Sequence, residues 1–396
     1  MTLVLYGNGG WIIISGCHFI ADTDRSLECS IKSGSQDRGG RLRYRGFTLF
    51  LCTTLLFGQT PKYTPDGFRV AREGYQFIFP RDHGNHPDFK TEWWYVTGHF
   101  INKINGHRYG YQLTFFRQAS PKNQWRGNSS WQSDQIYMAH AALTDVDGEI
   151  FTFDERLNRG GLLAWSSEKD LHIVNESWSI KRQPNGTIDI KFNVKSSMLK
   201  LALVPETTLV TFGKNGVSRK GEDPTAASYY LTYPRLTTVG YLVTPQGQYP
   251  VSGLSWMDHE ISSNQLSSSQ TGWDWAGIHL NNKTSLMFYR LRLTSGQQDP
   301  YSSITEIDAK GSITRSTNNF VINVLSTWTS PISKTTYPAE ITITAWGRTY
   351  RLKPILENQE LVVKSMGGLG YWEGACKAFL DNQEVGSAYL ELTGYQ

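Results

Sequence analysis

Hydrophobic and polar positions alternate along this chain in short runs that are separated by turn signals. Residues Ile136–Leu143 and Glu149–Phe153 are two such runs, and the pair Asp147-Gly148 lies between them. Short alternating runs on either side of an Asp-Gly pair predict a β-hairpin. Further turn signals stand at Asn185-Gly186, Asn215-Gly216 and Lys310-Gly311. The pattern continues almost throughout the chain beyond residue 61, and it predicts an all-β fold.

Two stretches of the chain, Trp93–Phe100 and Trp273–Leu280, resemble each other. Each has aromatic residues at its first and third positions, a histidine at its seventh and an apolar residue at its eighth. The two stretches begin 180 residues apart, at Trp93 and Trp273. A spacing of this size is typical of duplicated β-barrels rather than of a propeller or solenoid. The polar, aperiodic stretch Ser262–Thr271 predicts a linker between the halves. We therefore expect one barrel in residues 61–265 and a second barrel in residues 266–396.

The first 60 residues have the layout of an export signal. The apolar run Phe47–Phe57 follows the basic stretch Arg41–Arg45, which is the order found in signal peptides. The run is too short to span a bilayer, and no later run is long enough, so we expect no transmembrane helix in the mature chain. Residues 1–60 are interpreted as an N-terminal extension that contains a signal peptide, with residues 1–40 upstream of a start that is mis-assigned. A buried strand is an alternative for the apolar run.

The composition narrows the range of functions. The formal net charge of +4 is small for 396 residues, and no basic cluster is interleaved with aromatic residues, so nucleic-acid binding is not expected. Cys376 is the single cysteine beyond residue 60, which excludes an internal disulfide in the folded region and suits a small buried side chain. No phosphate-binding, zinc-protease or Gly-x-Ser-x-Gly motif occurs. Nine histidines leave a scattered metal site open, but no spacing argues for a metal or a cofactor.

The densest group of chemically active side chains lies in residues 256–260. In an extended strand, Trp256, Asp258 and Glu260 share one face, whereas Met257 and His259 point to the other. Two carboxyl groups about 7 Å apart beside an indole repel each other and lose hydration, which raises the pKa of at least one. His259 would reach the same cavity only at a bulge or a strand end. A structural role, tying down loops at a barrel rim, is the alternative.

The aromatic stretch that precedes His99 also alternates. Period two places Trp93 and Tyr95 on one face of a strand, and Glu92 and Trp94 on the other. Such aromatic faces form a hydrophobic core more often than a ligand platform.

Five blocks in order resemble the carotenoid 1,2-hydratase family, and among its branches the secreted AttH type. The blocks are Thr91–His99, Ser255–Glu260, Gly272–Trp275, Tyr371–Gly374 and Tyr389–Tyr395. The resemblance covers about residues 64–396. It implies two tandem lipocalin-like antiparallel β-barrels packed together, with an apolar ligand cavity and no cofactor.

The family's named reaction adds water to a double bond of an acyclic carotenoid, which requires a proton donor, a stabilised cation and one delivered water. On this resemblance Asp258 or Glu260 is the acid and His259 is the base. The expected substrate-binding residues are aromatic: Trp256, Trp273, Trp275, Trp93, Trp94 and Tyr289. Two positions depart from the hydratase pattern, because Ile261 replaces a tryptophan and the strand around Tyr289 carries no carboxylate.

Two functions therefore remain open. The first is a cofactor-independent hydratase acting on a long apolar substrate. The second is a non-catalytic carrier of a lipid or other hydrophobic ligand that serves an ABC exporter, as the AttH resemblance suggests. A secreted hydrolase is a weaker third idea, because no activated nucleophile is visible. All of them place the protein in the periplasm or outside the cell, with peripheral attachment to a membrane left open.

Overall fold

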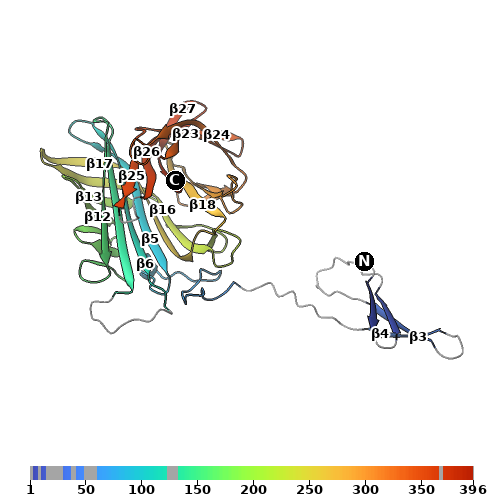
Figure 1. Ribbon diagram of the computed structural model, residues 1–396. Helices are drawn as coiled ribbons and strands as arrows, with labels where there is room; N and C mark the ends of the chain where they lie inside the picture. The colour runs from blue at the N-terminus through green and yellow to red at the C-terminus, as the bar shows by residue number, and fades with distance from the viewer. Residues whose placement is uncertain are drawn as a thin grey trace. The chain divides into compact units, whose positions relative to one another are not determined.

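The computed structural model describes residues 60–122, 133–364 and 369–395, together with the backbone of four strands in residues 1–59 (Figure 1). The chain divides into two compact units, residues 1–59 and 60–396. The first unit is an antiparallel sheet in the order β1-β2-β3-β4. Its strands are β1 (Leu3–Gly7), β2 (Gly10–Ile14), β3 (Ser30–Gln36) and β4 (Leu42–Thr48). The predicted signal run, residues 47–57, begins in β4 with Phe47 and Thr48, and its remainder, residues 49–57, lies outside the described residues, so the signal peptide stays a prediction.

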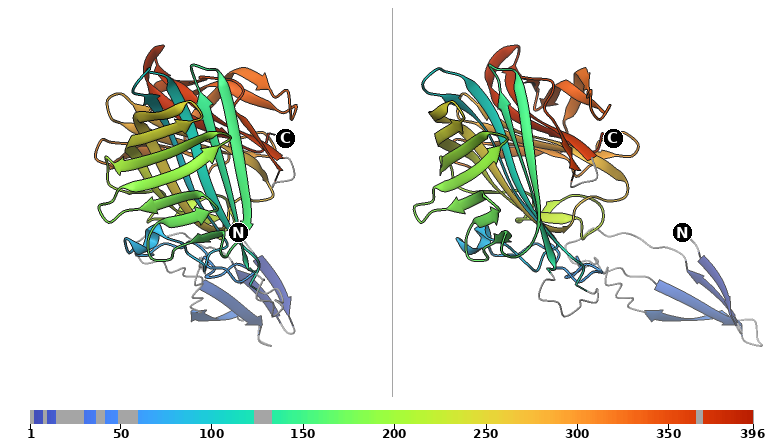
Figure 2. Two further views of the ribbon diagram at one scale, coloured as in Figure 1. Left: turned by 90° about the vertical axis from the view of Figure 1, so that its left-hand side faces the viewer. Right: turned by 60° about the vertical axis from the view of Figure 1, so that its left-hand side comes forward.

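The second unit contains two antiparallel sheets (Figure 2). The first has 13 strands, in the order β8-β7-β6-β5-β17-β16-β13-β12-β11-β10-β9, and β14 and β15 pair with β16. Its strands are β5 (Thr91–Asn102), β6 (Arg108–Ala119), β7 (Gln135–Asp145), β8 (Ile150–Arg159), β9 (Ala164–Ser166), β10 (His172–Asn175), β11 (Trp178–Arg182), β12 (Ile188–Val194), β13 (Ser197–Pro205), β14 (Val210–Thr211), β15 (Ser218–Arg219), β16 (Ala227–Thr244) and β17 (Gly247–Asn264). A short 3₁₀ helix, η1 (Arg81–His83), precedes β5.

The second sheet has 10 strands in the order β21-β20-β19-β18-β27-β26-β24-β23-β22, and β25 pairs with β26. Its strands are β18 (Gln270–Leu280), β19 (Ser285–Leu293), β20 (Ser303–Ile307), β21 (Ile313–Thr317), β22 (Val321–Thr329), β23 (Thr336–Ala345), β24 (Arg348–Pro354), β25 (Glu360–Val363), β26 (Leu369–Leu380) and β27 (Gln383–Leu392). The chain thus changes sheet within residues 265–269. The predicted all-β class with two packed antiparallel sheets is confirmed, whereas the domain limits stay a prediction.

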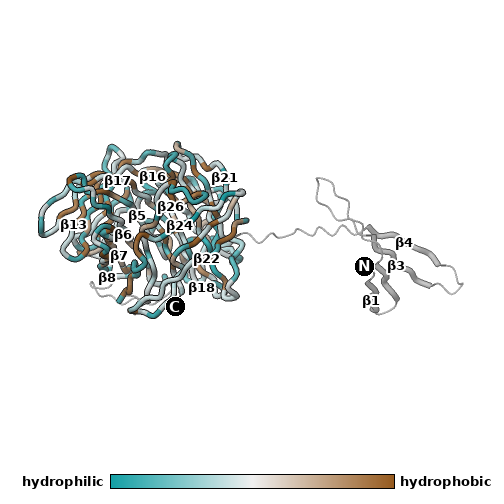
Figure 3. The backbone as a smooth tube through the Cα atoms, turned by 90° about the horizontal axis from the view of Figure 1, so that it is seen from above, coloured by the Kyte–Doolittle hydropathy of each residue, from teal (hydrophilic) through white to brown (hydrophobic). Residues whose placement is uncertain are grey.

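The alternating pattern of the sequence explains how each sheet buries one face. In β12, Ile188, Ile190 and Phe192 are buried at every second position, while Lys191 between them is exposed. Hydrophobic stretches therefore lie along the strands, and the peripheral turns are largely hydrophilic (Figure 3). Hydrogen bonds connect the two ends of the first sheet. Asn158 of β8 donates to the side-chain oxygen of Asn175 on β10, and the Asn175 amide donates to the backbone oxygen of Tyr137 on β7. The sheet therefore curls into a nearly closed barrel.

Within residues 60–396 the two sheets share an aromatic core. It joins Tyr95, Tyr230 and Trp256 of the first sheet to residues of β18 and β19. Glycines allow the two sheets to approach each other closely. A Cβ atom added at Gly277 would lie 2.9 Å from the Trp256 ring. One added at Gly110 would lie 2.5 Å from the Ala375 Cβ on β26. Neither position has room for a side chain in the present packing.

The two histidines of the predicted repeat occupy equivalent places between the sheets. His99 Nε2 lies 2.8 Å from the backbone oxygen of Ala388 in the second sheet. His279 Nε2 lies 2.9 Å from the backbone oxygen of Pro234 in the first sheet. Each repeat histidine therefore ties its own sheet to the other one. The structure contains no helix, within the part of the chain that it describes, with the length and apolar character needed to cross a bilayer.

Candidate active site

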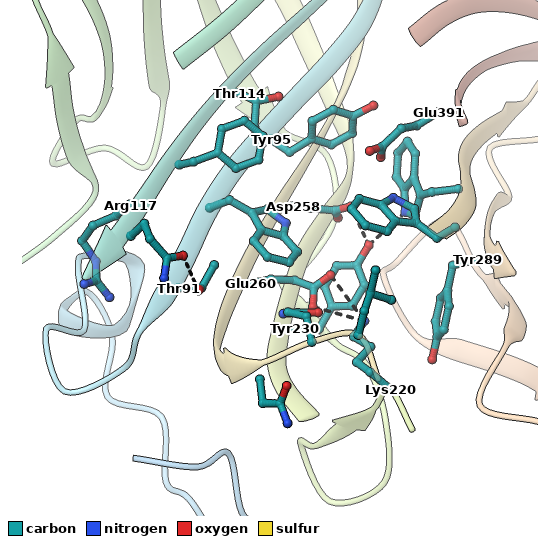
Figure 4. A pocket seen from close by; sticks show the side chains of 18 of the residues that line it. Thr91, Tyr95, Thr114, Arg117, Lys220, Tyr230, Asp258, Glu260, Tyr289 and Glu391 are labelled. Atoms are coloured by element: carbon teal, nitrogen blue, oxygen red, sulfur yellow. Dashed lines mark hydrogen bonds and ion pairs between the residues drawn. The ribbon is translucent and has the colours of Figure 1, made fainter. Parts of the chain in front are cut away.

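A cavity of about 460 Å³ lies between the two sheets (Figure 4). Strands β5, β6, β16 and β17 form one wall, and β18, β19, β26 and β27 form the other. Its volume is within the range of small-molecule sites. The central lining residues are Trp93, Tyr95, Thr114, Tyr230, Asp258, Glu260, Trp273, Trp275, Tyr289, Glu373 and Glu391. The cavity therefore combines aromatic walls with four carboxyl groups.

Regular pairing of β17 decides which of its residues face this cavity. The register between β17 and β5 runs without a break from Val251 to Ser262. Asp258 and Glu260 line the cavity, whereas Met257 belongs to the core inside the first barrel. Side chains alternate along a stretch of strand whose register is unbroken, as it is here against β5. His259 therefore points away from the cavity.

Asp258 lies in the cavity wall and is almost fully buried. Its Oδ2 accepts a hydrogen bond from the Tyr230 hydroxyl at 2.7 Å. Its Oδ1 accepts from Thr232 Oγ1 at 2.6 Å and from Trp256 Nε1 at 2.7 Å. Burial raises the pKa of Asp258 to about 7, against the opposing effect of these three donors, and Glu260 adds to the rise. Asp258 can thus hold or release a proton near neutral pH.

Glu373 and Glu391 form a second acidic group across the cavity. They are direct cross-strand neighbours on β26 and β27, and the Tyr95 hydroxyl donates to Glu373 Oε2 at 2.7 Å. Burial and the neighbouring Glu391 raise the pKa of Glu373 well above its usual value. Burial, and then Asp258 and Glu260, raise the pKa of Glu391 to about 8. Because two neighbouring carboxylates repel each other, these raised pKa values favour the retention of one proton by the pair near neutral pH.

Glu260 is in a different electrostatic environment from these three acids. Its carboxylate makes an ion pair with Lys220 Nζ at 3.1 Å and accepts from Ser228 Oγ at 2.5 Å. The Lys220 ammonium also lies over the rings of Tyr230 and Tyr289, 4.7 and 4.6 Å from their centroids. A carboxylate paired with a cation is a poor proton donor. The geometry therefore favours Asp258 and the glutamate pair as acids over Glu260.

The aromatic residues of the cavity hold one another in fixed orientations. Trp275 Nε1 donates to the Tyr230 hydroxyl at 2.9 Å. The rings of Tyr95 and Trp275 meet edge to face with centroids 5.1 Å apart. Indole and phenol faces attract cations. The wall formed by these rings, together with Trp273, can thus stabilise a carbocation.

Three of the residues predicted for the site do not line this cavity. Trp256 is fully buried and contributes through its hydrogen bond to Asp258. Trp94 and His259 lie on the opposite face of β5 and β17, where their rings stack with centroids 4.8 Å apart. His259 and Trp94 therefore do not reach this cavity, contrary to the expected arrangement beside Asp258, and their roles as a base and as a substrate contact stay predictions. Strand alternation is the cause in both cases.

The other predicted residues do face the cavity. They are Trp93, Trp273, Trp275, Tyr289, Asp258 and Glu260. Whether they act on a substrate stays a prediction.

Sequence reasoning missed Glu373 and Glu391, although both lie in blocks that carry the family resemblance, Tyr371–Gly374 and Tyr389–Tyr395. The available signal was an acid with apolar or aromatic neighbours in each block, Glu373 after Trp372 and Glu391 between Leu390 and Leu392, and such acids are rarely buried unless they have a partner or a role.

Known proteins share this architecture. The sequence model of the AttH-like family matches residues 70–395. A crystal structure of an AttH-type protein from Nitrosomonas europaea is 30% identical and has a TM-score of 0.76, covering 83% of this chain and 100% of that one. Kievitone hydratase from Nectria haematococca, at 13% identity, has a TM-score of 0.62 and covers 84% of this chain and 98% of its own, so it shares the fold. No curated protein matches the sequence significantly. The chain belongs to the AttH-like family.

Proposed function

We propose that this protein is a cofactor-independent hydratase that adds water to a carbon–carbon double bond of a long apolar substrate, such as an acyclic carotenoid or another isoprenoid. The observation that carries the proposal is the placement of Glu373 and Glu391 as cross-strand neighbours in the wall of an aromatic cavity, where burial and the neighbouring Glu391 raise the pKa of Glu373. Hydration of an unactivated alkene starts with proton transfer to carbon, and a buried carboxyl group that stays protonated near pH 7 is suited to that step.

The proposed reaction needs no group from outside the cavity except substrate and water. The glutamate pair gives its proton to one alkene carbon, and the alkene π electrons form the new C–H bond. The resulting cation lies against Trp273, Trp275 and Tyr230, whose ring faces lower its energy. Water attacks the cation, and its proton returns to the carboxylate that the first step created. The acid is thereby restored, and the base assigned to His259 is not required.

The carrier function remains the second candidate, and one observation favours it. Asp258 and Glu260 are both held in hydrogen bonds or ion pairs by neighbouring side chains, as they would be in a purely structural role. In that case the exported protein would hold a lipid in the cavity and deliver it to an ABC exporter from the periplasm. The two candidates differ in whether the bound ligand is converted.

Incubation with lycopene, neurosporene and kievitone in ¹⁸O-labelled water distinguishes the two candidates. A hydratase yields a product that carries one heavy oxygen, detected by mass spectrometry. Because general acid catalysis contributes roughly 10²- to 10⁴-fold, Glu373→Gln and Glu391→Gln should each lower the rate by at least about 100-fold. Glu340→Gln, on β23 outside the cavity, serves as the control.

Two results would count against the hydratase. If both cavity variants kept the wild-type rate, the glutamate pair would not be the acid. If native mass spectrometry instead showed a stoichiometric, unaltered ligand and no labelled product, the carrier function would be supported.

A further inference from the structure

A second buried cluster of ionisable side chains lies inside the first barrel, on the face of β5 and β17 that is turned away from the cavity. Glu92 Oε1 lies 2.8 Å from His86 Nδ1 and 2.8 Å from His259 Nε2. All three side chains are buried. Their ligand atoms lie within 4.8 Å of one another, and no other group of three such residues occurs in residues 60–122, 133–364 and 369–395.

The protonation of His86 makes this arrangement unusual. Its Nδ1 faces Glu92 Oε1, and its Nε2 lies 3.1 Å from Asp82 Oδ1. Both partners are acceptors when ionised, so both contacts are hydrogen bonds only if the buried ring carries two protons. A cation between His86 Nδ1 and Glu92 would remove that requirement. The ring would then be neutral, with its Nε2–H donated to Asp82.

We propose that His86, Glu92 and His259 bind a divalent transition metal ion of the zinc class. Two imidazole nitrogens and one carboxylate oxygen form a known zinc ligand set. Metal-bound histidines usually donate their other ring N–H to a carboxylate, and Asp82 stands at that position beside His86. The proposal does not rest on the hydratase function, because the cluster does not line the cavity.

The carboxylates of Glu92 and Asp82 are arranged in a way that suits a bound metal ion. Arg117 Nε and the backbone N–H of His86 donate to Glu92 Oε2, so Oε1 is the oxygen that faces the two histidines and would act as a single-oxygen ligand. Asp82 is paired with Arg81 at 2.9 Å.

Such an ion would have a structural effect. It would join β5 and β17 to the segment that follows η1, because the three ligands come from these three parts of the chain. The adjacent position on β17 is Asp258, so the ion would also fix the strand that carries a cavity acid. Metal–ligand bonds of about 2 Å place tetrahedral ligands roughly 3.3 Å apart, so the two 2.8 Å contacts of Glu92 Oε1 would have to lengthen.

Metal analysis of the purified full-length protein tests the proposal. After saturation with Zn²⁺ and removal of free metal by dialysis, elemental analysis should find one zinc per chain. Co²⁺ substitution should give the visible absorption bands of a tetrahedral site. His259→Gln should lose both signals, and it is expected to fold because glutamine can still donate to Glu92. Asp82→Asn, which keeps all three ligands, should weaken binding by about 10- to 100-fold.

His172→Gln, which changes a histidine on β10 of the same sheet, provides the matched control and should bind like wild type. Folded wild-type protein that retains no Zn²⁺ or Co²⁺ would overturn the proposal and leave the cluster as a protonated hydrogen-bond network. Metal binding that survives in His259→Gln would also overturn it, because the ion would then lie elsewhere.

Discussion

Replacing Asp258 with asparagine tests whether burial keeps this carboxyl group protonated. Asparagine has nearly the same shape but never ionises. Its side-chain oxygen can keep the bonds from Trp256 Nε1 and Thr232 Oγ1, and its amide group can face the Tyr230 oxygen. The variant therefore imitates the neutral form of Asp258. Its stability relative to wild type should depend on pH, because only the wild-type side chain titrates.

The magnitude follows from the raised pKa. Below the usual aspartate pKa of 3.8 the side chain is protonated in both the folded and the unfolded chain. Between 3.8 and about 7 the unfolded chain loses the proton and the folded chain keeps it, so the folded state loses stability as pH rises. At about 1.4 kcal/mol per pH unit, the loss is about 2 kcal/mol at pH 5 and about 4 kcal/mol above pH 8.

Urea unfolding of both proteins at pH 5 and pH 9, followed by tryptophan fluorescence, measures this difference. The free energy of unfolding of Asp258→Asn relative to wild type should rise by roughly 2–3 kcal/mol between the two pH values. Asp308→Asn is the control. Its turn hydrogen bonds lower the pKa of Asp308, so it is ionised at both pH values and its replacement should have the same effect at each. A pH-independent effect of Asp258→Asn would refute the reasoning.

Three further variants test individual contacts. Gly110→Val should lower stability by about 1–3 kcal/mol, measured by thermal unfolding, because its Cβ has no room against β26; unchanged stability would contradict the close packing. Trp256→Phe removes a donor to Asp258, so it should raise the pKa of that carboxyl group further in an infrared titration. Glu92→Gln should cost about 3–5 kcal/mol in urea unfolding, since Arg117 loses its buried partner; a neutral effect would show that the pair is dispensable.

The fold could be predicted because strand alternation and turn residues are local signals. The same alternation correctly separated Asp258 and Glu260 from His259. The family resemblance nevertheless assigned His259 to the cavity, because a motif names residues without saying which face of the strand they occupy.

Other features of the site depend on which strands become neighbours. Glu373 and Glu391 meet only through the pairing of β26 with β27. His86, Glu92 and His259 meet only because β5 pairs with β17 and the segment after η1 folds against them. Such contacts between distant segments are invisible to spacing rules, which explains why the glutamate pair and the histidine cluster were missed.

Infrared spectroscopy of the protein labelled with ¹³C-glutamate tests the central claim most directly, since it reports protonated glutamate side chains without interference from Asp258. We expect a protonated glutamate carboxyl band that persists at pH 7 in wild type and disappears in the double variant Glu373→Gln/Glu391→Gln. A wild-type spectrum without such a band at pH 7 would mean that both glutamates are ionised, and would contradict the claim that the cavity holds a proton donor.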